Sequence, residues 1–128
     1  MIQLQNIVLQ SLTTKRQVLG QILVCSGCCC GQTDKGAPAI PLEWLKKSWK
    51  EARLLRSIQL TITGCLGPCE LTNVISILTP QKQIWLGKIT EHSQYEALFE
   101  WGKASAEAGY LLDLPELFHN HIFERFKN

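Results

Sequence analysis

Residues 57–69 read Ser57-Ile58-Gln59-Leu60-Thr61-Ile62-Thr63-Gly64-Cys65-Leu66-Gly67-Pro68-Cys69. In the first half of this stretch apolar side chains alternate with polar ones, which predicts a strand with one buried face. The strand ends in a loop that carries two cysteines. An earlier apolar run, residues 21–24, also predicts a buried strand and also ends at cysteines, in Cys25-Ser26-Gly27-Cys28-Cys29-Cys30. The sequence therefore predicts two strands, each followed by a loop that carries cysteines, and both the fold and the site are inferred from them.

The segments around these strands predict a mixed sheet. Residues 31–41 are rich in Gly and Pro and predict a loop, and Pro41 then begins a helix that runs to about Leu55. A strand–helix–strand unit favours a right-handed crossover and parallel pairing. Residues 73–78 and 83–87 predict a hairpin around the turn at 79–82. A second helix follows, with Ser93 and Glu96 as its capping box.

Asp113-Leu114-Pro115-Glu116 repeats a helix-start signal before a third helix, on which Phe118, Ile122 and Phe126 lie in line. The whole order predicts an α/β, thioredoxin-like fold: a four-stranded mixed sheet with helices on its faces and an added C-terminal helix. We divide the chain into an N-terminal extension (1–19), the thioredoxin-like domain (20–108) and a C-terminal helical extension (109–128) packed on the same domain.

Length and composition are those of one globular domain. The chain has 128 residues, 45% hydrophobic and 19% charged, which is enough to bury a core. No run approaches the 18 apolar residues of a membrane span. The N-terminus lacks a basic start followed by a long apolar stretch, so we expect no signal peptide and a reducing, cytoplasmic location. In such a compartment clustered cysteines are metal ligands or redox thiols more often than disulfides.

The six cysteines lie in only two clusters, Cys25 to Cys30 and Cys65 to Cys69. If the two preceding strands are parallel neighbours, their carboxyl ends meet at one sheet edge, where ligands gather in open α/β folds. Thiolates in a four-point arrangement select zinc or an iron–sulfur cluster. The pattern Cys-x4-Cys…Cys-x3-Cys is looser than the Cys-x2-Cys knuckles of common zinc sites and suits a [2Fe–2S] cluster, which needs two ligands on each iron.

Both cysteine motifs, with residues 73–77 after them, resemble those of the thioredoxin-like [2Fe–2S] ferredoxins over residues 20–105. The spacing is similar to that of the ferredoxin-like subunit of respiratory NADH dehydrogenase. The chain also resembles small bacterial ferredoxin-domain proteins associated with cobalt chelatase. The resemblance implies a [2Fe–2S] one-electron carrier, not an enzyme, with Cys25 and Cys30 on one iron and Cys65 and Cys69 on the other. Cys28 and Cys29 depart from the family pattern, so either could replace Cys25 or Cys30.

Three other functions remain open. Structural zinc would use Cys25, Cys28, Cys65 and Cys69. A thiol–disulfide oxidoreductase would use Cys25-Ser26-Gly27-Cys28, although it would leave the second cluster without a role. A metal carrier would use Cys28, Cys29 and Cys30. Under the cluster interpretation Cys28 and Cys29 are small hydrophobes or sites of oxidative damage, or one of them is a spare ligand during cluster loading.

Charge is unevenly distributed, and it bears on the partners. Residues 1–60 carry a balance of +5 and residues 91–128 a balance of −4. The excess peaks in the first helix, where a solvated face is one interpretation and a docking patch for an acidic redox protein is the other, with Lys46, Lys47, Lys50 and Arg53 as its residues. We expect no nucleic-acid partner and find no phosphate-binding glycine motif. The third helix could pack on the domain, or it could pack against a second copy of the chain and so form a homodimer.

Overall fold

A computed structural model describes residues 12–127; residues 1–11 of the predicted extension, and with them the start of the chain, lie outside the described residues. One sheet has the strand order β2-β1-β3-β4-β5. Its strands are β1 (Gly20–Cys25), β2 (Ile58–Thr63), β3 (Ile75–Leu78), β4 (Gln83–Leu86) and β5 (Ile122–Phe123). The α-helices are α1 (Leu42–Glu51) and α2 (His92–Ala108).

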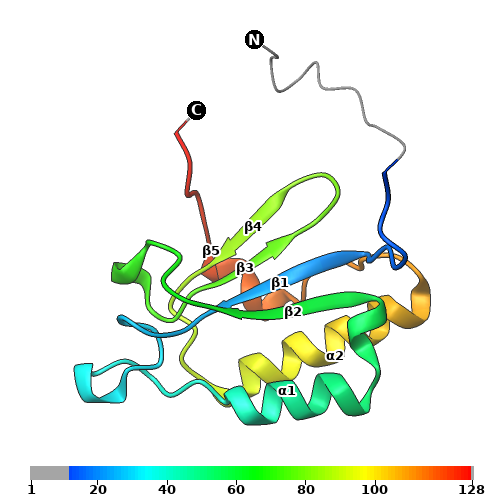
Figure 1. Cartoon of the computed structure of the whole chain (residues 1–128). Coiled ribbons are helices and arrows are strands. Elements are labelled where there is room, and N and C mark those ends of the chain that lie inside the picture. The colour runs from blue at the N-terminus through cyan, green and yellow to red at the C-terminus, as the bar shows by residue number, and fades with distance from the viewer. Residues whose placement is uncertain (1–11, 128) are drawn as a thin grey trace.

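The pairing confirms the predicted mixed, thioredoxin-like sheet (Figure 1). β1 and β2 are parallel, with Gly20 opposite Ile58 and Cys25 opposite Thr63, and α1 forms the crossover between them. β3 is antiparallel to β1 and to β4, so β3 and β4 form the predicted hairpin. The β-branched and apolar runs of these segments satisfy their backbone groups in the ladder. In β1, buried and half-buried residues alternate as far as Val24.

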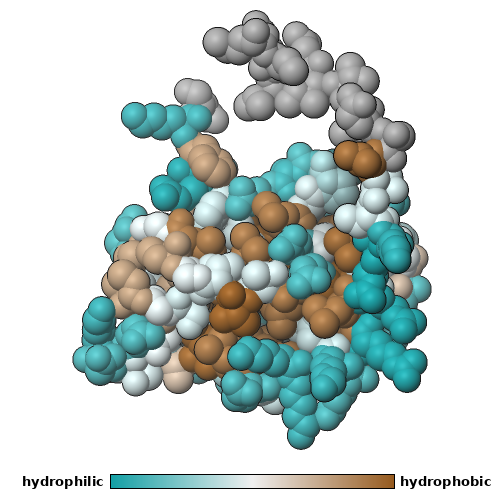
Figure 2. All heavy atoms as spheres, in the orientation of Figure 1, coloured by the Kyte–Doolittle hydropathy of each residue, from teal (hydrophilic) through white to brown (hydrophobic). Residues whose placement is uncertain are grey.

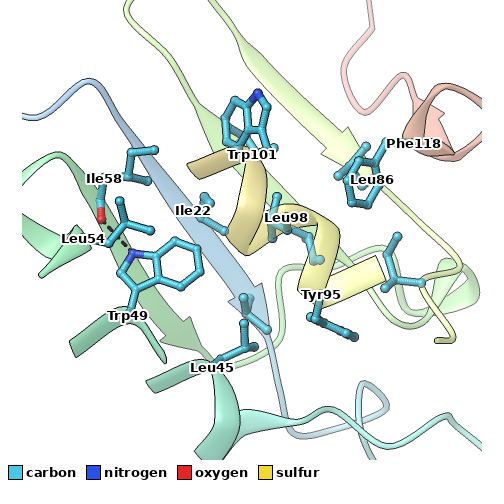
Figure 3. Packing of buried hydrophobic residues seen from close by; sticks show 14 residues of the cluster. Ile22, Leu45, Trp49, Leu54, Ile58, Leu86, Tyr95, Leu98, Trp101 and Phe118 are labelled. Carbon is cyan, nitrogen blue, oxygen red and sulfur yellow. Dashed lines mark hydrogen bonds between the residues drawn. The ribbon is translucent and has the colours of Figure 1, made fainter. Parts of the chain in front are cut away.

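The two α-helices lie on the sheet as predicted, and both cover the same face (Figure 1). Ile22 and Val24 of β1 pack in one core with Leu45 and Trp49 of α1 and with side chains of α2 (Figure 3). The indole Nε1 of Trp49 donates a hydrogen bond of 3.0 Å to the carbonyl of Ile58, so α1 is tied to the start of β2. Burying a donor with its acceptor keeps this polar atom from destabilising the core.

The other face of the sheet bears a different set of side chains. Register places Leu23 beside Thr61 on β2 and Ser76 on β3, and Ser76 beside Trp85 on β4. Ser76 is fully buried, and its hydroxyl accepts a hydrogen bond of 2.8 Å from the Gln83 side chain. On this face the hydrogen-bonded Ser76 thus lies between the apolar side chains of Leu23 and Trp85. No helix lies over this face in the described structure (Figure 1).

The C-terminal segment corrects the prediction of a third α-helix. Glu116–His121 form a 3-10 helix, and Ile122–Phe123 then add β5 to the edge of β4, so the sheet has five strands rather than four. Phe118 is fully buried in the core, whereas Phe126 is 68% exposed. The pattern at 118, 122 and 126 fits a helix, but pairing with the open edge of β4 satisfies backbone groups that a helix would leave unpaired there.

Two helix boundaries also differ from the prediction. α1 ends at Glu51, and Arg53 has φ +53° before a 3-10 turn at Leu54–Arg56. α2 begins two residues earlier than expected from Ser93 and Glu96: Glu91 is the N-cap, and Gln94 completes the capping box. Neither helix, nor any other in residues 12–127, has the length and apolar character needed to cross a bilayer.

Candidate metal centre

The two cysteine loops begin side by side because β1 and β2 are parallel and in register. Cys25 ends β1 opposite Thr63 at the end of β2, and the next backbone N–H, that of Ser26, donates a hydrogen bond of 3.0 Å to the carbonyl of Thr63. Both loops therefore leave the same edge of the sheet, at the left in Figure 1. The predicted convergence of the two clusters is what the structure shows.

Between the loops lies a small hollow. Its lining contains all four predicted ligands and one further thiol: Cys25, Cys29, Cys30, Cys65 and Cys69. Gly27, Gly67, Pro68 and Val74 complete the lining, in which the described structure has no His, Asp or Glu side chain. Cys28 is outside this lining but close to it. The assignment of Cys25, Cys30, Cys65 and Cys69 as the ligand set remains a prediction.

Three sulfur atoms, two of them on exposed residues, form one close group beside the hollow. The Sγ atoms of Cys65 and Cys69 are 3.4 Å apart. With the Sγ atom of Cys28 they form a trio in which all three atoms lie within 4.8 Å of one another. The trio joins the first loop to the second, and it includes a cysteine that we did not predict as a primary ligand.

Burial divides the six thiols into two tiers. Cys25 and Cys30 are 3% and 2% exposed and pack with Val74 and Trp85 in a small apolar cluster. Cys28 and Cys65 are exposed, and Cys29 and Cys69 are half-buried. The inner tier is thus shielded from water by the sheet, while the outer tier faces solvent.

The environments of the thiols shift their pKa values in opposite directions. Burial raises the pKa of Cys25 to about 12, although the backbone N–H of Leu66 in the other loop opposes this shift. The hydrogen bond between Cys65 and Cys69 lowers the pKa of Cys65 and raises that of Cys69 to about 12, because one thiolate accepts from the other thiol. The neighbouring thiol of Cys29 raises the pKa of Cys28. A metal would displace protons from all of these groups on binding.

Asn73 fixes the first loop, and sequence reasoning missed this role because it treated residue 73 only as a strand residue. The Asn73 side chain is fully buried. Its Oδ1 accepts a hydrogen bond of 2.8 Å from the backbone N–H of Gly31, and its Nδ2 donates one of 2.9 Å to the carbonyl of Pro38. Both polar atoms of this buried amide are hydrogen-bonded to residues that are distant in the sequence, so the side chain holds the loop after Cys30 against the sheet.

Two positive charges near the thiols were also missed. Lys35 Nζ donates a hydrogen bond of 2.7 Å to the carbonyl of Cys28. Arg125 lies beside Gly67 of the second loop, with its guanidinium carbon 5.8 Å from the ring centre of Trp85. The sequence offers no signal for Arg125, since it reaches the loop only because β5 pairs with β4.

The basic residues of the first helix lie elsewhere. Lys46, Lys47, Lys50 and Arg53 are all exposed, and Figure 2 shows hydrophilic residues along the lower edge of the molecule where α1 runs. Lys46 is 3.6 Å from Glu43 and Lys47 is 3.9 Å from Glu51, both as exposed pairs within the helix. Arg53 directly precedes the 3-10 turn before the start of β2, so it lies at the end of the sheet opposite the thiol loops, which follow the ends of β1 and β2.

The donor set fits a soft metal or a cluster. Six thiols, two of them buried against apolar side chains, suit iron–sulfur or zinc chemistry and disfavour hard cations such as Mg²⁺ or Ca²⁺. The indole N–H of Trp85, in the same apolar cluster as Cys25 and Cys30, is buried without a hydrogen-bond partner among the described residues. A donor left unpaired beside buried thiols is compatible with an acceptor such as sulfide or thiolate, since sulfur accepts such bonds at metal sites.

No family model matches the chain, and no curated protein matches it. Among solved structures, the chain is similar to a thioredoxin-like [2Fe–2S] ferredoxin from Aquifex aeolicus, with 15% identity, coverage of 88% of this chain and 96% of that chain, and a TM-score of 0.49. A structure of the wild-type ferredoxin from the same organism gives 14% identity, 85% and 100% coverage and a TM-score of 0.45.

Proposed function

We propose that the protein is a [2Fe–2S] ferredoxin, a one-electron carrier between protein partners rather than an enzyme. Cys25 and Cys30 would hold one iron, and Cys65 and Cys69 the other. The bound cluster would supply the redox chemistry, while the protein sets its potential and exposes it to a partner. The observation that carries the proposal is the meeting of the two thiol loops in one hollow without competing oxygen or nitrogen ligands.

The two tiers of thiols support this role. The inner pair, Cys25 and Cys30, lies against the sheet and away from water. The outer pair, Cys65 and Cys69, lies near the surface. A redox centre held in this way has one side shielded from solvent and one side within reach of a docked protein, which is what electron transfer between proteins requires.

Structural zinc is the second candidate, and the trio of Cys28, Cys65 and Cys69 is the observation that favours it. Three mutually close thiols could form most of a tetrahedral site. This reading leaves Cys30 buried without a role. A protein purified with one equivalent of zinc and no acid-labile sulfide would select it.

The thiol–disulfide alternative gains little support. An attacking thiol needs a low pKa and access to its substrate. Cys25 is 3% exposed, and burial raises its pKa to about 12. Cys28, its partner in the proposed redox motif, belongs to the trio with the second loop instead.

Docking of an acidic redox protein at Lys46, Lys47, Lys50 and Arg53, a homodimer and a cytoplasmic location remain parts of the proposal. The position of Lys35 and Arg125 beside the thiol loops adds a second place where positive charge would attract an acidic partner. A patch used for docking would make the rate of reduction by a purified acidic flavoprotein fall as salt rises. Exchange of Lys46 and Lys47 for Gln, compared with Lys35→Gln, would separate the two places.

The test is electron paramagnetic resonance of protein purified without air and reduced with dithionite, with iron and acid-labile sulfide determined on the same sample. We expect two irons and two sulfides per chain and the rhombic signal of a reduced [2Fe–2S] cluster. Cys65→Ser should abolish or strongly change the signal, whereas it should spare a Cys25–Cys28 oxidoreductase. A colourless wild-type protein that takes up no cluster from iron and sulfide would refute the proposal.

A further inference from the structure

The outer thiols form a group that shares Cys65 and Cys69 with the predicted ligand set and adds Cys28. Cys28, Cys65 and Cys69 have their Sγ atoms within 4.8 Å of one another. Cys28 lies outside the lining of the hollow, whereas its neighbour Cys29 lies within it. A four-ligand cage of Cys25, Cys30, Cys65 and Cys69 makes no use of Cys28, so its place beside the second loop requires a separate account.

The backbone at Cys28 adds an independent observation. Cys28 has φ +53°, in the left-handed region that residues other than glycine seldom adopt. The conformation is held by its surroundings: Gly27 N–H donates a hydrogen bond of 3.0 Å to the carbonyl of Cys30, and Lys35 Nζ donates one to the carbonyl of Cys28. Glycine would adopt this backbone without cost. Residues held in this region cluster at functional sites, and in this chain Arg53 and Lys88 adopt it as well.

We propose that Cys28, Cys65 and Cys69 form an outer three-thiolate site that takes up a thiolate-binding divalent metal ion, Fe²⁺ in the cell, before the ion passes to the inner thiols. The inference rests on the proposed function for its purpose, but the site itself does not. Three protein ligands leave a fourth position open for water or for a thiolate of a donor protein. An exposed site with an open position can accept an ion from a donor, which the buried Cys25 and Cys30 cannot.

The exchange is balanced in bonds and protons, and no electron is transferred. On uptake, metal–sulfur bonds form to Cys28, Cys65 and Cys69, and their thiol protons pass to solvent. On transfer inward, the bonds from the metal to Cys28, Cys65 and Cys69 break and bonds to Cys25 and Cys30 form. The two inner thiols lose their protons to solvent, and the three outer thiolates take up protons from solvent. Cys65 and Cys69 are then free to hold the second iron, which explains why they belong to both sites.

The experiment titrates reduced, metal-free protein with Co²⁺ under anaerobic conditions and follows the thiolate-to-cobalt charge-transfer and ligand-field bands. We expect the wild-type protein to bind the first equivalent with an intensity that matches three thiolates. Cys28→Ser should weaken this binding at least tenfold. Ser26→Ala, a change in the same loop outside both the trio and the lining of the hollow, should leave the affinity within about threefold, and Cys25→Ser should weaken it less than Cys28→Ser does.

Two outcomes overturn the inference: unchanged Co²⁺ affinity in Cys28→Ser, or an equal loss in Cys25→Ser, which would mean that the inner cage binds first. Cys28→Gly, which suits the left-handed backbone, serves as a second variant so that a folding defect does not decide the result. If the wild-type protein never assembles a cluster but binds Co²⁺ through the trio, the proposed function fails and the site stands. If a cluster forms and Cys28→Ser binds Co²⁺ normally, the site fails and the function stands.

Discussion

The guanidinium group of Arg125 fills the space that a side chain at Gly67 would need. Arg125 Nη2 lies 2.5 Å from the position of a Cβ atom built on Gly67, and Gly67 has φ +117°. This pair joins the C-terminal segment to the loop between Cys65 and Cys69. Glycine at this position therefore serves two purposes: it permits the backbone conformation of the loop, and it lets a positive charge lie against it.

Gly67→Ala should destabilise the metal-free protein by about 1–3 kcal/mol, because an L-residue is strained at this φ. The matched control is Gly64→Ala in the same loop, where an added Cβ meets nothing within 4 Å and φ is not left-handed; its effect should stay within about 0.5 kcal/mol. Urea unfolding in the presence of a thiol reductant measures both. Recovery of Gly67→Ala by Arg125→Ala would show that the clash, not the backbone, is the cause.

Arg125→Gln should lower the reduction potential of the loaded protein, because a nearby positive charge stabilises the reduced and more negative cluster. Unit charges about 10 Å apart interact by about 0.4–1.7 kcal/mol for effective dielectric constants of 80 to 20. At about 1.4 kcal/mol per 59 mV for one electron, the shift is about 20–70 mV. A redox titration followed by visible circular dichroism measures it. Arg53→Gln, at the far end of the sheet, should shift the potential little, and an equal shift there would contradict the assignment.

Asn73→Ala should cost about 2–4 kcal/mol in the metal-free protein, because it removes two hydrogen bonds and leaves the Gly31 N–H and the Pro38 carbonyl without their partner. We also expect faster loss of the bound metal to a chelator, since the loop after Cys30 is released from the sheet. Gln59→Ala provides the comparison: its half-buried amide makes a single bond of 3.2 Å to the Leu60 carbonyl, and its loss should cost less than 1 kcal/mol. Equal losses of unfolding free energy in Asn73→Ala and Gln59→Ala would show that Asn73 does not anchor the loop after Cys30.

The metal-free protein should lose stability as pH rises above 9. Burial raises the folded-state pKa of Cys25 to about 12 from a value of 9.0, so the neutral thiol is favoured in the native state. The unfolded chain ionises first, and its ionisation draws the equilibrium towards unfolding between these two values. The slope from this group is about 1.4 kcal/mol per pH unit. Urea unfolding between pH 7.5 and 10.5 measures it, and Cys25→Ala should flatten the curve above pH 9.

Sequence periodicity was sufficient for the elements whose side chains alternate or recur regularly. The alternation in residues 58–63 predicted β2, and the apolar run before Cys25 predicted β1, because local pattern and burial agree there. Parallel pairing followed from the intervening helix. The convergence of the two thiol loops then followed from the pairing, which is why residues far apart in the chain could be assigned to one site.

Only the tertiary structure decided the rest, because it depends on which surfaces and backbone groups are left unpaired once the elements pack. Ile122–Phe123 pair as a strand with the open edge of β4, although residues 118–126 have a helical pattern. That pairing brings Arg125 to Gly67, an association that no local signal contains. Six cysteines in two loops indicate a thiol site from the sequence alone. The sheet beneath the loops decides which thiols are buried and which face solvent, so that Cys25 and Cys30 are buried whereas Cys28 is exposed.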